Sequence, residues 1–229
     1  MSVVQTKFQD GRNYLPGESR GYVAQLLDAC QPELLAALMN YEAGSTKTLG
    51  EFPAVHFRGY SDGFALLGYG EKGAELVGDV SPLILKALAK RSDRVIQVET
   101  KAMAMSAELR PYKLEYTVGK MVVQKKSRHF DLLSDPVAGK AHIEALFLRS
   151  LERNAEAVGV VLPDGIQVEF LGASSTFAAK NGDGRPALMG VNGAVFAVNL
   201  RLTGIWSVGY LLSKGYGQFN ATAQLGGAQ

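Results

Sequence analysis

The chain has 229 residues, of which 47% are apolar and 20% are charged, and its formal net charge is +2. This composition excludes an intrinsically disordered chain and suits one sizeable domain or two small ones. The small net charge means that any binding of nucleic acid has to rest on a local basic patch.

The sequence also disfavours membrane and metal-binding classes. No apolar run approaches the roughly 18 residues of a membrane span, and the first residues lack the apolar core of a signal peptide. The chain has one cysteine, Cys30, and three histidines, which allow no disulfide framework and show no metal-ligand spacing. We therefore expect a cytoplasmic protein with no membrane contact, no metal site and no cofactor.

The first half predicts a strand, two helices, a hairpin, a helix and a strand, in that order. "VVQTKF" reads as a strand, one helix begins near Ser19, and a second begins at Pro32. "PAVHFRGY" and "GFALLGYG" flank the turn signal "SDG" and predict a β-hairpin. Ser81 and Pro82 predict the start of a further helix, which precedes the alternating strand "RVIQVETKAMAM". Residues 1–108 thus predict β-α-β-β-α-β, the order of a ferredoxin-like half.

The second half repeats this order over residues 109–229. "YKLEYTV" and "KMVVQ" predict a strand with a bulge at Gly119, and residues 137–157 predict an amphipathic helix. "IQVEFL" and "GAVFAVNLRLTG" predict strands on either side of the turn-rich "NGDGR"; "SVGYLL" predicts a short helix and "QFNATA" the last strand. The predicted fold is α+β: tandem ferredoxin-like (RRM-like) β-α-β-β-α-β units with a C-terminal glycine-rich loop.

The segment "GYGEKG", residues 68–73, has the G-x-G-x-x-G spacing of dinucleotide-binding loops. In such loops a helix N-terminus holds the pyrophosphate, and Glu99 stands where an acid for the ribose would be expected. Gly78 and Pro82, however, interrupt the helix that this motif needs, and the preceding strand is predicted to pair in a hairpin. We therefore interpret the segment as a glycine-rich turn. A nucleotide-dependent enzyme that uses Gly68, Gly70 and Gly73 is a distant alternative.

Alternation in "VHFRGY" places His56 and Arg58 on one face of a strand, together with Tyr60. An imidazole beside a guanidinium suits acid–base chemistry on a phosphodiester. The alternative is a half-exposed strand whose polar residues simply face outward.

The segment "QKKSRHF" gathers Lys125, Lys126, Arg128 and His129 before an aromatic residue. Such a cluster suits contacts with phosphates, and the Phe130 ring could stack on a base. A solvated run of charges is the alternative. Other cations that would extend a basic patch are Lys120, Arg149 and Arg153.

Arg12, Tyr14 and Arg20 flank the loop that leads into the first helix. A cation near a helix N-terminus opposes the macrodipole, so Arg20 is unusual at that position. A bound anion would remove the conflict. An exposed arginine that costs roughly a few tenths of a kcal/mol is the alternative.

The end of the chain carries the most specific motif. In "SVGYLLSKGYGQFNA" a predicted helix precedes Lys214, Gly215, Tyr216 and Gly217, and the last strand follows. The glycine N–H groups could meet a phosphate, the lysine adds charge and the tyrosine offers a stacking face, whereas a helix C-cap with a turn is the alternative. Two ferredoxin-like halves with such a loop resemble the CRISPR-associated RAMP superfamily over nearly the whole chain. Within it, "VHFRGYSDGFALLGYG" and "GYLLSKGYGQFNA" resemble the repeat-processing endoribonucleases, the type IV branch above all.

The resemblance implies a metal-independent endoribonuclease that binds CRISPR repeat hairpins and cleaves precursor crRNA by attack of a 2′-hydroxyl. It also implies that the protein stays bound to mature crRNA in an effector complex with other subunits. Members of this family often have a histidine base near the start of the first helix, where this chain has arginines. We therefore expect Arg12 and Arg20 to stabilise transition-state charge, with His56 as a reserve acid or base and with Arg20→Ala lowering the cleavage rate far more than the affinity. The residues expected to bind RNA are Arg58, Lys120, Lys125, Lys126, Arg128, His129, Arg149, Arg153, Lys214, Gly215, Tyr216 and Gly217. A non-catalytic RAMP subunit that binds and caps guide RNA is the alternative function.

Overall fold

The computed structural model describes residues 2–27, 32–42, 45, 47, 49–91, 94–125, 136–180 and 186–221. The chain forms two compact units. The first contains Met1–Ala104 with the short segments Ala157–Gly159 and Ser213–Gly215; the second contains Met105–Glu156, Val160–Leu212 and Tyr216–Gln229.

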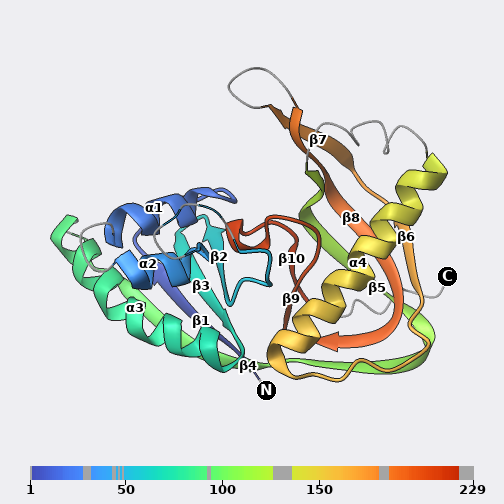
Figure 1. The fold of residues 1–229 in the computed structure, drawn as a ribbon, viewed down its shortest axis with the longest axis horizontal. Coiled ribbons are helices and arrows are strands. Elements are labelled where there is room, and N and C mark those ends of the chain that lie inside the picture. The colour runs from blue at the N-terminus through green and yellow to red at the C-terminus, as the bar shows by residue number, and fades with distance from the viewer. Residues whose placement is uncertain are drawn as a thin grey trace. The chain divides into compact units, whose positions relative to one another are not determined.

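The first unit has the strand and helix order of a ferredoxin-like domain. Its elements are β1 (Ser2–Gln9), α1 (Glu18–Leu27), α2 (Pro32–Leu38), β2 (Val55–Tyr60), β3 (Gly63–Tyr69), α3 (Gly70–Arg91) and β4 (Gln97–Ala104). The four strands pair antiparallel in the order β2-β3-β1-β4, and the three helices pack on one face of this sheet (Figure 1). The predicted first helices, hairpin and last strand of this half are confirmed.

The core of the first unit lies between that face and the helices. Phe8 of β1 stacks on Phe64 of β3 with ring centroids 5.2 Å apart. The helix α1 contributes the apolar stripe of Val23, Leu26 and Leu27, all buried. Burial of such side chains is the main stabilising contribution of a helix that is only 10 residues long.

The third helix begins earlier than the sequence predicts. It starts at Gly70, not near Ser81, and continues through Pro82 to Arg91 without a break. Proline cannot donate a helical hydrogen bond, but the apolar stripe on both sides of it, Val77, Val80, Ile84 and Leu88, is buried in the core of the unit. The prediction of an interrupted helix is therefore wrong.

The glycine pattern at residues 68–73 marks a close-packed junction of strand and helix. A Cβ atom at Gly73 would lie 2.4 Å from the Ala54 carbonyl oxygen, and one at Gly70 would lie 2.3 Å from that of Ala157. Gly70 also has φ +68°, which favours glycine. The preceding strands are antiparallel, so the parallel crossover of a dinucleotide-binding unit is absent from this sheet. The pattern is explained by backbone packing at the start of α3 and not by a free turn.

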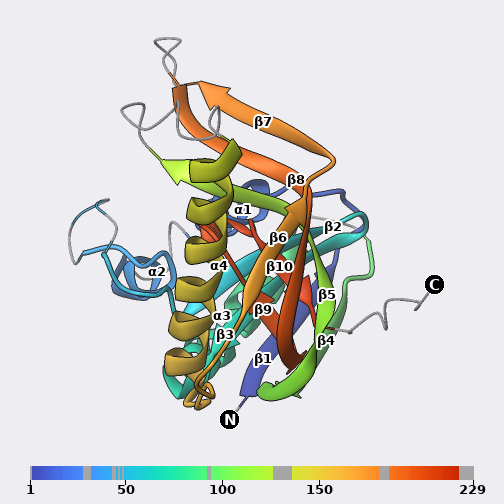
Figure 2. The same ribbon diagram turned by 90° about the vertical axis from the view of Figure 1, so that its right-hand side faces the viewer.

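The second unit contains a long curved sheet covered by one helix. Its elements are β5 (Ser106–Lys125), α4 (Pro136–Val158), β6 (Val168–Gly172), β7 (Ser175–Lys180), β8 (Pro186–Thr203), β9 (Ile205–Ser207) and β10 (Gln218–Asn220). The 3₁₀ helix η2 (Leu212–Lys214) begins at the end of a segment of this unit and continues into the segment Ser213–Gly215 of the first. The sheet order is β5-β8-β6, β7 also pairs with β8, and β9 pairs with β10. Figure 2 shows α4 running along this sheet. The Phe147 ring of α4 packs against the Phe196 ring of β8 and the Phe219 ring of β10. The ring centroids lie 4.2 and 6.1 Å apart, respectively.

Two local predictions for the second unit are wrong. Residues 207–212 do not form a helix, because Gly209 and Leu211 have φ values of +94° and +59° and only the short η2 follows. Gly119 is not a bulge, since β5 keeps its register with β8 on both sides of it; the irregularities lie between Leu109 and Leu114 and between Val122 and Gln124. The short η2 thus stands where the sequence predicts the last helix of the second half.

Candidate nucleic-acid interface

A lysine and two aromatic rings form an exposed cluster, here called the stacking platform, in the second unit. The Lys120 Nζ lies 4.8 Å from the centroid of the Phe177 ring and 5.8 Å from that of the Tyr216 ring. The two rings are nearly parallel, with an interplanar angle of 18° and centroids 6.4 Å apart. Gly190 of β8 makes room for the Phe177 ring, because a Cβ atom there would lie 2.3 Å from ring carbon Cζ. Half-exposed parallel rings beside a cation suit the stacking of nucleic-acid bases.

The glycine-rich loop is fixed to strand β5 next to this platform. The Gly217 N–H donates to the Lys120 carbonyl at 2.7 Å, and the Gly217 carbonyl accepts from the Val208 N–H at 2.9 Å. Gly217 has φ +68°, and a Cβ atom there would lie 1.7 Å from the Val208 oxygen. The prediction that this N–H is available to a phosphate is therefore wrong. The glycine instead holds Tyr216 in place beside Lys120 and Phe177.

A second cationic cluster, here called the arginine pocket, lies between α4 and the turn that follows β9. The cavity has a volume of about 70 Å³, and its lining residues are Leu146, Arg149, Ser150, Arg153, Gly209, Tyr210 and Leu212. Arg149 and Arg153 are exposed and one helical turn apart. The Lys125 Nζ lies 5.3 Å from the centroid of the Tyr210 ring. The structure thus brings together three of the predicted RNA-binding cations around one tyrosine.

Buried polar side chains of α4 hold the turn that shapes the arginine pocket. The Asn154 amide donates to the Ser207 carbonyl at 2.7 Å and accepts from the Ser207 N–H at 3.1 Å. The Ser150 hydroxyl accepts from the Gly209 N–H at 3.0 Å, and the Tyr210 N–H donates to the Val122 carbonyl of β5 at 2.8 Å. These bonds satisfy backbone groups that a buried turn would otherwise leave unpaired.

The two arginines near the first helix have different environments. Arg12 is exposed; its guanidinium lies 5.4 Å from the Tyr22 ring centroid and donates to the Tyr22 hydroxyl at 3.3 Å. Arg20 is only 8% exposed, donates to the Met39 carbonyl at 2.6 Å and lies over the Tyr41 ring. Because the Met39 carbonyl lies just past the end of α2, the cation complements that helix terminus. The alternative of an exposed Arg20 is wrong, and a direct contact of this arginine with RNA stays a prediction.

His56 does not face outward from the strand. Its side chain is fully buried between the rings of Phe52 and Tyr69, whose centroids lie 4.9 and 4.4 Å away. Burial lowers the pKa of His56 to about 3, so the imidazole is neutral at ordinary pH. Because His56 is buried, it is not the half-exposed histidine that the sequence predicts. The expectation that it serves as a reserve acid or base is corrected for the same reason. Arg58, two residues on, is half-buried with its guanidinium 5.2 Å from the Tyr60 ring centroid.

The remaining predicted site residues fall into two groups. Lys214 is exposed at the end of η2, and Gly215, with φ +84°, packs against the Phe57 carbonyl of β2 in the first unit. The predicted RNA-binding residues Lys126, Arg128 and His129 lie outside the described residues.

Sequence reasoning missed three residues of these two clusters. Phe177 lies in no quoted motif, and Tyr210 lies in "GYLLSKGYGQFNA" but was not selected. Each becomes significant only through a lysine of β5 that is distant in the sequence. Gly190, one of two glycines within the long strand β8, is the available signal, since a glycine within a strand often marks a close approach of another group.

Within the described part of the chain, no three His, Cys, Asp or Glu side chains form a group that could hold a metal ion. Among the helices described, none combines the length and the apolar character needed to cross a bilayer.

Comparison with known proteins gives one family match. The model of the family described as "Type IV CRISPR-associated endonuclease Csf5" matches residues 2–223. No curated protein matches the chain significantly.

Solved structures share the fold over nearly the whole chain. The structure titled "Csf5, CRISPR-Cas type IV Cas6 crRNA endonuclease" has 16% sequence identity and a TM-score of 0.70, and the match covers 96% of this chain and 99% of that one. Two Cas6b structures have 12% and 10% identity and TM-scores of 0.65 and 0.61; the matches cover 96% and 95% of this chain and 100% and 97% of theirs. At such identities the likeness concerns the fold alone, and it confirms the predicted α+β class with tandem ferredoxin-like units.

Proposed function

The chain belongs to the family of type IV CRISPR-associated Csf5 endonucleases, and from this premise we propose that it binds CRISPR repeat RNA and cleaves precursor crRNA. The match of the family model over residues 2–223 is the observation that carries the proposal. The solved structure titled as a crRNA endonuclease, which has the same fold over 96% of this chain, supports it.

The stacking platform and the arginine pocket support the binding of RNA. A single-stranded or splayed base can stack on the parallel rings of Phe177 and Tyr216, with Lys120 next to the adjoining phosphate. The arginine pocket, with a volume of about 70 Å³, offers Arg149 and Arg153 to a phosphate group of the same strand. Lysines and arginines that hold phosphates would also keep the mature crRNA bound after cleavage, in an effector complex with other subunits.

We propose that the cleavage reaction uses the 2′-hydroxyl beside the scissile phosphate as the nucleophile and needs no metal ion. As the 2′-oxygen attacks phosphorus, its proton passes to solvent water and a 2′,3′-cyclic phosphate forms. The bond from phosphorus to the 5′-oxygen breaks, and that oxygen takes up a proton from water. Arg12, exposed beside Tyr22, is the cation proposed to stabilise the charge of the transition state. Arg20 is proposed as a positioning residue, because its contact with Met39 ties α1 to the end of α2. The remaining barrier would be lowered by in-line alignment of the bound RNA.

The direct test incubates the purified full-length chain with a CRISPR repeat hairpin in excess EDTA. A single product with a 2′,3′-cyclic phosphate end, formed at the same rate with and without Mg²⁺, is the expected result. Cleavage only after Mg²⁺ is added would overturn the metal-independent mechanism while leaving the endonuclease in place.

One observation favours a second candidate function, a non-catalytic RAMP subunit that binds and caps guide RNA. Of the two histidines in the described residues, His56 is buried, and the half-buried His142 lies 2.9 Å from the Val123 carbonyl through Nε2. Neither offers an exposed general base. Tight binding of the repeat hairpin with the RNA intact under all ionic conditions would establish this second function and exclude the first.

A further inference from the structure

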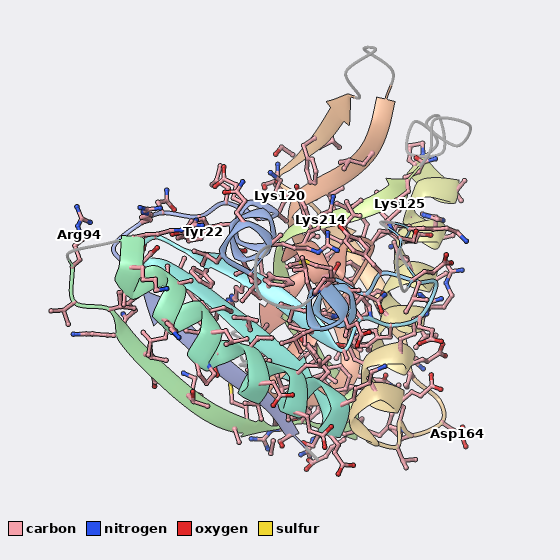
Figure 3. The ribbon with its side chains drawn as sticks, turned by 60° about the vertical axis from the view of Figure 1, so that its left-hand side comes forward. Tyr22, Arg94, Lys120, Lys125, Asp164 and Lys214 are labelled. Carbon is pink, nitrogen blue, oxygen red and sulfur yellow. The ribbon has the colours of Figure 1, made fainter. Side chains whose placement is uncertain are left out.

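Strand β4 leaves one edge of the first unit's sheet open. In the strand order β2-β3-β1-β4, the described residues pair β4 only with β1. The pairing is regular over eight residues, from Gln97 opposite Gln9 to Ala104 opposite Ser2, without a bulge. Proteins usually blunt an edge of this length with proline, a bulge, a covering segment or charged side chains. The strand β4 contains neither proline nor a bulge, and its charges are one glutamate, Glu99, and one lysine, Lys101. Figure 3 shows β4 as the outermost strand, running from the side on which Arg94 is labelled.

An apolar groove lies beside this open edge. Its volume is about 360 Å³, and its wall includes Val77, Pro82 and Leu85 of α3 and Val98 and Thr100 of β4. Leu85 is 38% exposed and Val98 is 41% exposed. The even-numbered face of β4 is therefore apolar but only partly covered by α3.

The sequence of β4 is complementary to itself in one antiparallel register. When two β4 strands are placed antiparallel with Thr100 opposite Thr100, Glu99 of each copy lies opposite Lys101 of the other. The same register places Val98 opposite Ala102 on the face that borders the groove. Each dimer would thus contain two opposite-charge pairs on one face and two apolar pairs on the other.

Neighbouring registers are disfavoured by the same charges. A two-fold axis perpendicular to the sheet places the same face of both copies on the same side. Only registers in which a residue lies opposite its own copy at the axis keep this alternation of side chains. The next register in one direction places Glu99 opposite Glu99, and the next in the other direction places Lys101 opposite Lys101. The charges therefore select the register centred on Thr100.

We propose that β4 is a self-association edge, on which a second copy of this chain adds its own β4 to form one continuous eight-stranded antiparallel sheet. The backbone groups of both edges would be paired, and the groove of each copy would continue across the two-fold axis. A second copy fits this edge because β4 alone supplies both the anion, Glu99, and the cation, Lys101, in the spacing that antiparallel pairing needs.

The test measures the monomer–dimer equilibrium of the full-length, RNA-free chain by sedimentation over the micromolar range. Because no RNA is present, its outcome is independent of the proposed nuclease function. Wild type is expected to dimerise reversibly. E99K and K101E should each weaken the dimer about tenfold or more, because two attractive pairs become two repulsive ones. The control Asp164→Lys makes the same change of net charge as E99K on an exposed loop of the second unit and should dimerise as wild type does.

Two further measurements separate this edge from any other contact. An equimolar mixture of E99K and K101E should form mixed dimers, because each lysine then faces a glutamate. The double variant E99K/K101E should regain the wild-type dissociation constant. A chain that stays monomeric throughout, including one that binds only a strand of another protein, would overturn the proposal, as would a dimer that none of these substitutions changes.

Discussion

The backbone N–H of Gly217 donates to the carbonyl of Lys120 at 2.7 Å, and this bond joins the glycine-rich loop to the strand that carries the platform lysine. The Gly217 N–H is therefore not free to meet a phosphate. The loop supports Tyr216, whose ring centroid lies 5.8 Å from the Lys120 Nζ.

Substitution of Gly217 by alanine should destabilise the second unit and weaken RNA binding together. An alanine would need a strained positive φ and would clash with the Val208 oxygen, so we expect a loss of about 1–3 kcal/mol in the free energy of unfolding. Gly119→Ala is the matched control, since no atom lies within 4 Å of a Cβ atom there. Urea unfolding measures both variants, and equal stabilities would contradict the role given to Gly217.

Removal of an aromatic ring from the platform should weaken binding of repeat RNA. Phe177→Ala and Tyr216→Ala each remove a face on which a base can stack, which should raise the dissociation constant by roughly 5- to 150-fold. Tyr112→Ala is the control, because this β5 tyrosine is 54% exposed and belongs to neither cluster. Fluorescence anisotropy at one fixed salt concentration measures the effect. Unchanged affinity of both platform variants would show that RNA does not stack there.

Loss of the two arginines of the arginine pocket should weaken the salt dependence of RNA binding. If Arg149 and Arg153 each neutralise a phosphate, the double alanine variant should lower the slope of log affinity against log salt by about 1.5–2. Arg201→Ala, an exposed arginine on β8, should leave the slope unchanged. A parallel slope for wild type and the double variant would mean that these arginines do not contact phosphates.

Alanine variants of Arg12 and Arg20 should differ in whether they impair cleavage or stability. Arg20→Ala leaves the Met39 carbonyl without this donor and should cost about 1–3 kcal/mol in stability. Arg12→Ala, at an exposed site, should change stability by less than about 0.5 kcal/mol yet slow cleavage at saturating RNA about 100-fold. Single-turnover rates and unfolding curves on the same preparations check both. A normally stable Arg20→Ala that loses cleavage but not affinity would instead place Arg20 directly at the reacting phosphate.

Local patterns were sufficient for most of the fold because its core follows regular periodicity. The apolar stripe of Val23, Leu26 and Leu27 on α1 and the alternating Phe196 and Val198 on β8 are all buried. The start of α3 was missed because Gly78 and Pro82 oppose a helix locally, whereas burial of the apolar stripe of this helix in the core compensates for them.

The candidate site was harder to predict because its contacts are distant in sequence. Lys120 was selected as a cation, but its partner Phe177 lies on another strand, and only the glycine at 190 hinted at that ring. His56 was misplaced for a similar reason. Alternation within β2 says which face a side chain takes but not that Phe52, from the segment before the strand, lies against the ring.

The buried His56 makes stability depend on pH in a defined direction. Its pKa is about 3 in the folded chain, because burial disfavours the charged imidazole, and about 6.5 when unfolded. Between these values the unfolded chain binds more protons than the folded one, so stability falls as the pH is lowered below about 6.5.

We expect the first unit to lose about 2 kcal/mol of unfolding free energy from this histidine between pH 7 and pH 5, with a slope that approaches about 1.4 kcal/mol per pH unit. His56→Gln cannot take up that proton, so its stability should change with pH by about 2 kcal/mol less over the same interval, whatever its stability at pH 7. Urea unfolding curves of both chains, recorded at half-unit steps of pH, compare the two slopes directly. Parallel curves would mean that the imidazole is protonated as readily in the folded chain as in the unfolded one, which a ring fully enclosed by Phe52 and Tyr69 does not allow.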